Sequence, residues 1–395
     1  MSSKKIILIS GSSFPGTAGD TANYLELMRG LRRKVTEILL VCPQHRQSKS
    51  FDVMMKEESI SVIRVPFEPP RLANLTRDRS LLYLLKLAMF YTALFFTVAE
   101  VLSQNRNKSI IIRHSLLTIN LSPLLKIFHV RSLADGDPLS SSLVQTFDLI
   151  RLPKPVMSLM KIYEKAILSH YTSYLASTET QKKLLIQLGV PESRIIVRTV
   201  AIDVRHVPSY DLDDIPPNTF GYFGALEKWQ NVDLLLRTWA EVVKKKEEAR
   251  LFIIGDGSLK NQLKRLAGNL NIEDSVTFYD GVSRDILWNK YFRLFRVVLV
   301  PRSPTYLAGN PSMKIFEALA SGKPVIASSV KGVQDTAVEG MLLVSPEDEK
   351  AMSSAILRLC DDEHLLRQLS KLSVSSSKRL DISKQLDRFI NVLTR

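Results

Sequence analysis

The segment that begins at Asn310 and reads N-P-S-M-K-I-F-E-A-L-A-S-G-K-P-V-I-A-S is the strongest candidate for chemistry in this chain. Asn310, Pro311 and Ser312 are typical of the start of a helix, where free backbone amides bind anions. Glu317 lies about one turn farther along, and a carboxylate there is suited to holding sugar or ribose hydroxyls. The segment therefore predicts an anion site beside a group that binds hydroxyls.

The same segment predicts the elements that would hold this site. Apolar residues recur at helical spacing between Met313 and Ala320. Gly322 is a typical helix end, and the P-V-I-A sequence that follows predicts a strand buried on both faces. From the spacing alone, Lys314 and Glu317 also fit a solvated ion pair on a surface helix, so a structural role stays open.

Four other predicted strands are followed by suggestive loops, and ligands of open α/β sheets bind beyond the carboxyl ends of strands. The first loop offers Gly224 for close backbone approach and Lys228 for a diphosphate, although an ordinary strand–helix loop would look similar. I-G-D-G-S from Ile254 and D-G-V-S from Asp280 follow the next two strands. Arg302 follows the fourth strand as a possible second diphosphate cation, with a surface arginine as the favoured alternative.

Together these segments resemble the nucleotide-sugar site of retaining GT-B glycosyltransferases of the family-4 type, the group 1 glycosyltransferases. The usual pattern there has two Glu separated by seven residues, and the second is followed by G-x-P-V-[IV]-A. Glu317 falls on the second Glu and Gly309 on the first. A Pro-x-Lys-x-[FY]-Glu variant, found in capsule and lipid-linked glycan pathways, is similar to Pro311, Lys314, Phe316 and Glu317.

The resemblance implies transfer of a sugar from a nucleotide diphosphate sugar, with UDP or GDP favoured, to a hydroxyl of a lipid-linked or polysaccharide glycan. It also implies retention of anomeric configuration, without a metal or other cofactor. Glu317 would bind ribose hydroxyls, and Lys228 and Lys314 would neutralise the diphosphate. The implied donor-binding residues are Gly16, Gly224, Lys228, Gln230, Gly255, Gly281, Val282, Arg302, Asn310, Ser312, Met313, Lys314 and Glu317.

Departures from the family pattern keep a second function open. Gly309 stands where the family has its first Glu, and Ala225 stands where it has a phosphate-binding Arg. A Lys expected farther along the same loop is replaced by Gln230. The alternative is a non-catalytic GT-B protein that binds nucleotide or glycan as a subunit of a larger transferase.

The first half of the chain holds the residues implied for the acceptor side. Asp135, in an L-A-D-G-D segment interpreted as a loop, is the candidate for activating or orienting the acceptor. Asp-x-Asp binds a metal in other glycosyltransferases, but the GT-B surroundings favour an acceptor-side role. His114 ends a predicted strand and would line the same side, although a lone His there is more often structural. The glycine-rich loop around Gly16 is expected to face the donor.

Alternating strand and helix patterns predict an α/β protein with two doubly wound, Rossmann-like domains facing a central cleft, the GT-B arrangement. Residues 1–204 are expected to form the acceptor-side domain, completed by a C-terminal helix over 377–395. Residues 219–376 are expected to form the donor domain, with the proline-rich 205–218 as linker. Two cysteines are too few for a disulfide framework or a zinc site.

The net charge of +14 is concentrated in the first half. Residues 1–200 hold 27 Lys or Arg against 15 Asp or Glu, which suits an anionic membrane or an acidic acceptor. No nucleic-acid-binding motif is present, so nucleic acid is not an expected partner. Leu81 to Ala99 is apolar except for Lys86, and a buried or interfacial helix is favoured over a membrane span. We expect a cytoplasmic protein, peripheral on the inner face of the cell membrane.

Overall fold

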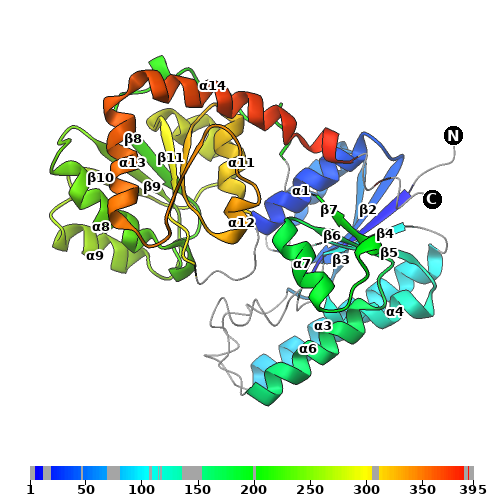
Figure 1. Cartoon of the computed structure of the whole chain (residues 1–395). Helices are drawn as coiled ribbons and strands as arrows, with labels where there is room; N and C mark the ends of the chain where they lie inside the picture. Colours follow the sequence, from blue (N-terminus) through cyan, green and yellow to red (C-terminus); the bar gives the residue numbers. More distant parts are fainter. Residues whose placement is uncertain are drawn as a thin grey trace. The chain divides into compact units, whose positions relative to one another are not determined.

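The structure, a computed structural model, consists of two compact α/β units (Figure 1). Unit 1 comprises Met1–Thr199 and Gln385–Arg395, and unit 2 comprises Val200–Lys384. The structure describes residues 5–11, 19–45, 48–68, 81–105, 109–113, 115, 118–135, 154–198, 202–304, 311–386 and 390.

Unit 1 is built on a parallel sheet of seven strands in the order β3-β2-β1-β4-β5-β6-β7. The central strands are apolar on both faces, as expected for a sheet covered by helices on each side. The strands are β1 (Lys5–Ile9), β2 (Glu37–Pro43), β3 (Ile60–Val65), β4 (Ser109–Arg113), β5 (Arg131–Asp135), β6 (Ser173–Ala176) and β7 (Ile195–Val197).

The helices of unit 1 follow the strands in the alternation that the sequence predicts. One short 3-10 turn, η2 (Ile119–Leu121), precedes α4 and matters for the surface described below. The α-helices are α1 (Gly19–Arg32), α2 (Ser48–Glu57), α3 (Leu81–Gln104), α4 (Ser122–Ile127), α6 (Lys154–Leu168) and α7 (Glu179–Gln187).

Unit 2 is built on a second parallel sheet, with six strands in the order β10-β9-β8-β11-β12-β13. The strands are β8 (Thr219–Phe223), β9 (Arg250–Ile254), β10 (Val276–Tyr279), β11 (Val297–Val300), β12 (Val325–Ser328) and β13 (Met341–Val344). The helices are α8 (Val232–Val243), α9 (Lys260–Asn269), α10 (Arg284–Ile286), α11 (Met313–Ala320), α12 (Lys331–Gln334), α13 (Glu349–Asp361) and α14 (Glu363–Arg379).

Two sequence-based boundaries differ from the structure. The expected linker 205–218 packs on unit 2, because Leu212 and Ile215 are buried and Arg296 Nε donates to the Ile215 carbonyl at 2.8 Å. Over its described residues, the expected helix 377–395 is interrupted. Helix α14 ends at Arg379, and Asp381 then forms a parallel bridge with Ile202 inside unit 2.

In unit 1 one interpretation from the sequence was wrong, and in unit 2 one helix is irregular. The segment before Asp137, interpreted as a loop, contains strand β5, and Asp135 is the last residue of that strand. The helix after β10 starts as α10 but continues as the π-helical turn η6 (Leu287–Tyr291). Such turns widen the helix locally and change which side chains point to a neighbouring element.

Candidate functional site

The strand order of unit 2 places β8 and β11 side by side at the centre of the sheet. Strands β9 and β10 follow β8 toward one edge of the sheet, and strands β12 and β13 follow β11 toward the other edge. Open α/β sheets bind ligands at such a reversal point, beyond the carboxyl ends of the strands. The two loops that leave this point are joined by a hydrogen bond from Ser303 N to the Trp229 carbonyl, at 3.2 Å.

The loop after β8 needs glycine at Gly224. Its φ is +122°, a conformation that side-chain-bearing residues rarely adopt, and a Cβ there would lie 2.6 Å from Cε of Lys314. The loop after β9 has the same requirement, because a Cβ on Gly255 would lie 1.9 Å from the Gly224 carbonyl oxygen. The two loops therefore touch backbone to backbone, and Lys314 fills the space that Gly224 leaves.

Lys314, in the first turn of α11, is the central cation of this cluster. Its side chain is buried, and Nζ donates to Gln230 Oε1 at 2.7 Å and to the Tyr222 hydroxyl at 3.3 Å. The amine also lies 4.6 Å from the centroid of the Tyr222 ring. Burial lowers the pKa of this amine well below its ordinary value, the charge of Arg302 lowers it further, and Glu317 opposes both.

Glu317, on the same helix, is also buried rather than solvated. Its Oε1 accepts a hydrogen bond from Arg284 Nε at 2.6 Å, and the two side chains are 7% and 21% exposed. The Arg284 guanidinium also lies 4.8 Å from the centroid of the Trp288 ring. Sequence reasoning missed Arg284 and Trp288. Their signal was position alone, since Arg284 directly follows the D-G-V-S loop.

Helix α11 begins directly after Ser312, where the sequence predicts an anion site. Ser312 is the residue before the helix, with extended backbone angles, and it is buried, while Met313 is half-buried. Arg302, for which a surface position was favoured, is instead only 5% exposed after the carboxyl end of β11. That expectation was wrong, because the segment 295–303 is buried throughout as the chain leaves the centre of the sheet.

Hydrogen bonds tie together the loops after β8, β9 and β10. Glu227 accepts from the Ser258 amide at 2.8 Å and from its hydroxyl at 2.6 Å. Asp256 accepts from the Gly281 amide at 2.7 Å. The hydrogen bond from Lys260 is the largest influence that lowers the pKa of Asp256 below its ordinary value.

Two further residues implied for the donor lie on these loops. Lys228 begins a 3-10 turn (Lys228–Gln230) and is exposed. Val282 is half-buried beside Gly281. Of the residues implied for the donor, Gly224, Gln230 and Lys314 lie in one cluster through the Lys314 contacts described above.

Asp135 occupies a buried charged cluster at the carboxyl end of the sheet of unit 1. It is 1% exposed, and its carboxylate lies 3.4 Å from Arg198 Nη2 and 4.0 Å from Arg113 Nη1. Arg113 is its register partner on the adjacent strand β4. Its charge is therefore compensated by two arginines, as buried charges require.

Four positions from the sequence analysis lie outside the described residues, namely Gly16, His114, Gly309 and Asn310. Within the residues that the structure does describe, no group of three or more His, Cys, Asp or Glu side chains is placed to hold a metal ion.

The sequence of unit 2 matches a known family. A family described as glycosyl transferases group 1 matches residues 217–362. The alpha-D-kanosaminyltransferase of Streptomyces kanamyceticus is 26% identical over 164 residues, 41% of each chain. The D-inositol 3-phosphate glycosyltransferase of Mycolicibacterium smegmatis is 27% identical over 265 residues, 61% of this chain and 57% of that protein. The chain thus spans about half the length of these two curated relatives.

Two solved structures have the same fold over nearly the whole chain. Anabaena HepE in complex with UDP-glucose has a TM-score of 0.74 at 16% identity, covering 98% of this chain and 100% of that one. The sucrose-phosphate synthase of Thermosynechococcus elongatus has a TM-score of 0.75 at 19% identity, covering 99% of both. The chain therefore carries a group 1 glycosyltransferase domain over residues 217–362 and has the two-domain α/β fold of the GT-B glycosyltransferases.

Proposed function

We propose that this protein transfers a sugar from a nucleotide diphosphate sugar to a hydroxyl of a lipid-linked or polysaccharide glycan, with retention of anomeric configuration and without a metal. The observation that carries the proposal is the cluster of Lys314, Gln230 and Gly224 at the centre of the unit 2 sheet. That cluster lies where α/β sheets bind ligands. HepE, a structural neighbour, was solved with UDP-glucose, and UDP or GDP is the donor we expect here.

Each group of the cluster has a part in this reaction. The amides that open α11 are suited to bind the diphosphate, and Lys228 is exposed and free to reach it. Lys314 supplies a buried cation, or a proton, where negative charge develops on the leaving nucleotide. Preorganised donors at such a position contribute most to the rate. Glu317 would bind the ribose hydroxyls while it also accepts the hydrogen bond from Arg284.

The family resemblance implies retention, and the carboxylates of the proposed site bear on how retention would be achieved. Retaining glycosidases use two carboxylates, one of them as a nucleophile. On α11 the carboxylate is Glu317, and Gly309 stands where the family has another. We therefore propose attack on the same face that the nucleotide leaves, assisted by the donor phosphate. Asp135 would orient the acceptor.

The second candidate function is a non-catalytic nucleotide-binding subunit of a larger transferase. The specific observation in its favour is that Gly309 and Ala225 stand where the family has its first Glu and its phosphate-binding Arg. Binding without turnover would then be expected. The two functions differ in whether a nucleotide sugar is consumed when acceptor is supplied.

The test is a thermal-shift titration with UDP, GDP, ADP and TDP, followed by an assay of nucleotide release from the matching sugar donors. Glu317→Gln should remove the shift from the one nucleotide that binds, since binding to the folded state raises the melting temperature. Glu247→Gln is the matched control, because Glu247 is exposed before β9 at the opposite end of that strand. A shift without nucleotide release in the presence of glycan acceptors would favour the binding subunit. The absence of any shift would overturn both functions.

A further inference from the structure

Helix α3 has an apolar face that unit 1 does not cover. Leu82, Leu85, Met89 and Phe96 are 61%, 50%, 49% and 66% exposed. Their spacing of three, four and seven residues places them on one side of the helix. The opposite side packs into the core of unit 1. A helix that is apolar all round is normally covered on every side.

The length and composition of α3 also indicate that one side of this helix is uncovered. The window Leu85–Gln104 is long and apolar enough to cross a membrane, yet only 28% of it is buried inside the protein. A core helix of comparable composition would be mostly buried. The exposed side of α3 is therefore a surface that some apolar partner covers.

Two other helices extend this apolar surface. Leu159, Ile162 and Tyr163 on α6 are 64%, 65% and 52% exposed, and Ile127 at the end of α4 is 66% exposed. The Tyr163 hydroxyl donates to Asn120 Oδ1 at 3.0 Å, which connects α6 to the turn η2. We call the exposed apolar residues of these three helices the apolar face of unit 1: Leu82, Leu85, Met89, Phe96, Ile127, Leu159, Ile162 and Tyr163.

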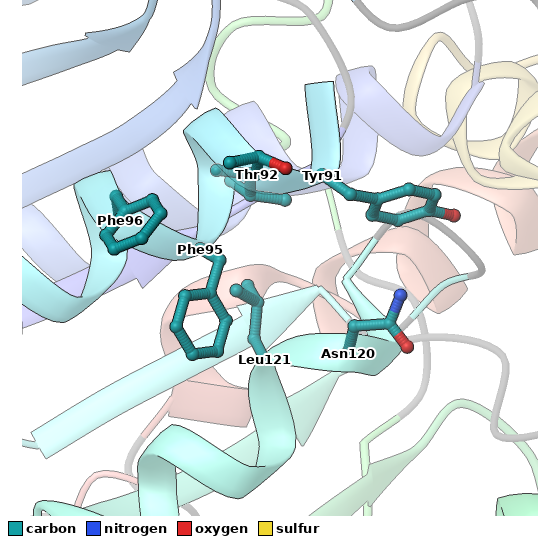
Figure 2. A pocket seen from close by; sticks show the side chains of 7 residues that line it. Tyr91, Thr92, Phe95, Phe96, Asn120 and Leu121 are labelled. Atoms are coloured by element: carbon teal, nitrogen blue, oxygen red, sulfur yellow. The ribbon is translucent and has the colours of Figure 1, made fainter. Parts of the chain in front are cut away.

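A pocket of about 250 Å³ adjoins this face at Phe96, between α3 and η2. Figure 2 shows Phe95 and Leu121 at its apolar part, with the polar ends of Tyr91 and Asn120 along one edge. Its lining residues are Tyr91, Thr92, Leu94, Phe95, Phe96, Asn120 and Leu121. Aromatic rings with a polar rim are typical of side chains at the boundary between water and lipid.

Basic side chains border the apolar face. Lys86, Lys126 and Lys161 are exposed, and each directly adjoins one of its apolar residues in sequence. In the described parts of α3, α4 and α6, the exposed acidic residue is Glu100, near the C-terminal end of α3. Long lysine side chains can lay their methylene stems along apolar surface and keep the charge in the headgroup layer.

We infer that the apolar face of unit 1 binds the surface of an anionic lipid bilayer. The apolar residues enter the boundary between headgroups and acyl chains, the pocket receives hydrocarbon, and the lysines meet lipid phosphates. A second copy of this chain is the less favourable occupant, because it would bring lysines from two identical faces together. The inference rests on the proposed function only for the lipid-linked acceptor, to which a bilayer-bound enzyme has direct access.

The test is sedimentation of the full chain with vesicles at low salt, comparing phosphatidylcholine alone with an equimolar mixture of phosphatidylcholine and phosphatidylglycerol. We expect binding to the anionic vesicles only. The double variant Phe96→Asp/Ile162→Asp should bind at least about tenfold more weakly, because two exposed apolar side chains no longer enter the lipid. Val53→Asp is the matched control, since Val53 is 60% exposed on α2, outside this face.

The charge component is tested separately. Lys86→Gln and Lys161→Gln should each weaken binding roughly fivefold, whereas Lys49→Gln on α2 should have no effect. No sedimentation, equal binding to neutral vesicles, or an unaffected double variant would overturn the inference. Self-association that the double variant abolishes, without vesicle binding, would show that a second copy covers the face. Nucleotide thermal shifts on the same preparations report the proposed function independently.

Discussion

Arg284 donates from Nε to Oε1 of Glu317 at 2.6 Å, and this contact joins the start of helix α10 to helix α11. The guanidinium also lies over Trp288. The carboxylate that the family resemblance assigns to ribose is thus held by an ion pair of its own chain. Any ligand that uses Glu317 must share it with Arg284 or displace Arg284.

The first prediction concerns the strength of this pair. Arg284→Ala should lower the free energy of unfolding by about 2 kcal/mol, because it removes the guanidinium of the ion pair from a buried carboxylate. A double-mutant cycle with Glu317→Gln, followed by chemical denaturation, should give a coupling energy above about 1 kcal/mol. The exposed pair Lys244–Glu241 provides the control cycle, with an expected coupling below that value. Equal coupling in both cycles would mean that burial does not strengthen the Arg284 pair.

The second prediction concerns the glycine beside Lys314. Gly224→Ala should cost at least about 2 kcal/mol of stability and weaken nucleotide binding, since the backbone conformation is strained for alanine and the methyl group would displace the end of the Lys314 side chain. Gly268→Ala is the matched control. No atom lies within 4 Å of a Cβ at Gly268 in helix α9, so this change should stabilise the protein by about 0.5–1 kcal/mol. Denaturation curves measure the stability of the two variants, and nucleotide thermal shifts measure their binding. Equal stability and equal binding in both variants would contradict the prediction.

The third prediction is that nucleotide binding takes up protons. The pKa of Lys314 is lowered in the free protein, and a diphosphate beside the amine would raise it again. Above the free-state pKa of Lys314, affinity should therefore fall as pH rises, until the pH passes the pKa of the bound state. Calorimetry in buffers of different ionisation enthalpy measures this uptake. Lys314→Met should abolish it and weaken binding roughly tenfold to a hundredfold. Proton uptake that persists in Lys314→Met would assign it to another group.

The fourth prediction uses Lys323, which is fully buried and donates from Nζ to the Phe295 carbonyl at 2.8 Å. Burial lowers the pKa of Lys323 from 10.5 to about 7. Above pH 7 the unfolded chain therefore binds more protons at this residue than the folded protein does. The contribution of Lys323 to the free energy of unfolding should therefore rise with pH between about 7 and 10.5, the pKa of the unfolded chain. Below pH 7 this contribution should stay constant.

The measurement for Lys323 is chemical denaturation at a series of pH values. Between pH 7 and pH 9, the free energy of unfolding should rise by about 2 kcal/mol more in the natural protein than in Lys323→Met. Parallel pH profiles for the two proteins would show that the amine keeps its proton inside the fold.

The two-sheet fold was predictable from sequence because buried parallel strands are continuous apolar runs, such as V-V-L-V at β11 and V-I-A-S at β12. The element that holds Glu317 was predictable for a related reason, since Gly322 and the proline after it mark where α11 stops. Strand β5 was missed because R-S-L-A-D is short and ends in charge. Its register with β4 becomes visible only in the sheet.

The partners of the site residues were not predictable, because they come from distant parts of the chain. Gln230 reaches Lys314 from 84 residues away, and Arg284 reaches Glu317 from 33 residues away. The burial of Arg302 has the same origin, since it depends on what the centre of a sheet packs against. Local spacing specifies which groups are available, and tertiary packing decides which of them meet.

The interlocked loops after β8, β9 and β10 set a condition for redesigning this protein. A Cβ on Gly257 would lie 2.3 Å from the Leu226 carbonyl, and Glu227 and Asp256 each bond to the neighbouring loop. A loop taken from a relative with a different nucleotide preference would therefore collide with, or lose contact to, the two that remain. Recombination within this family should succeed when the three loops are exchanged as one cassette and fail when they are exchanged singly.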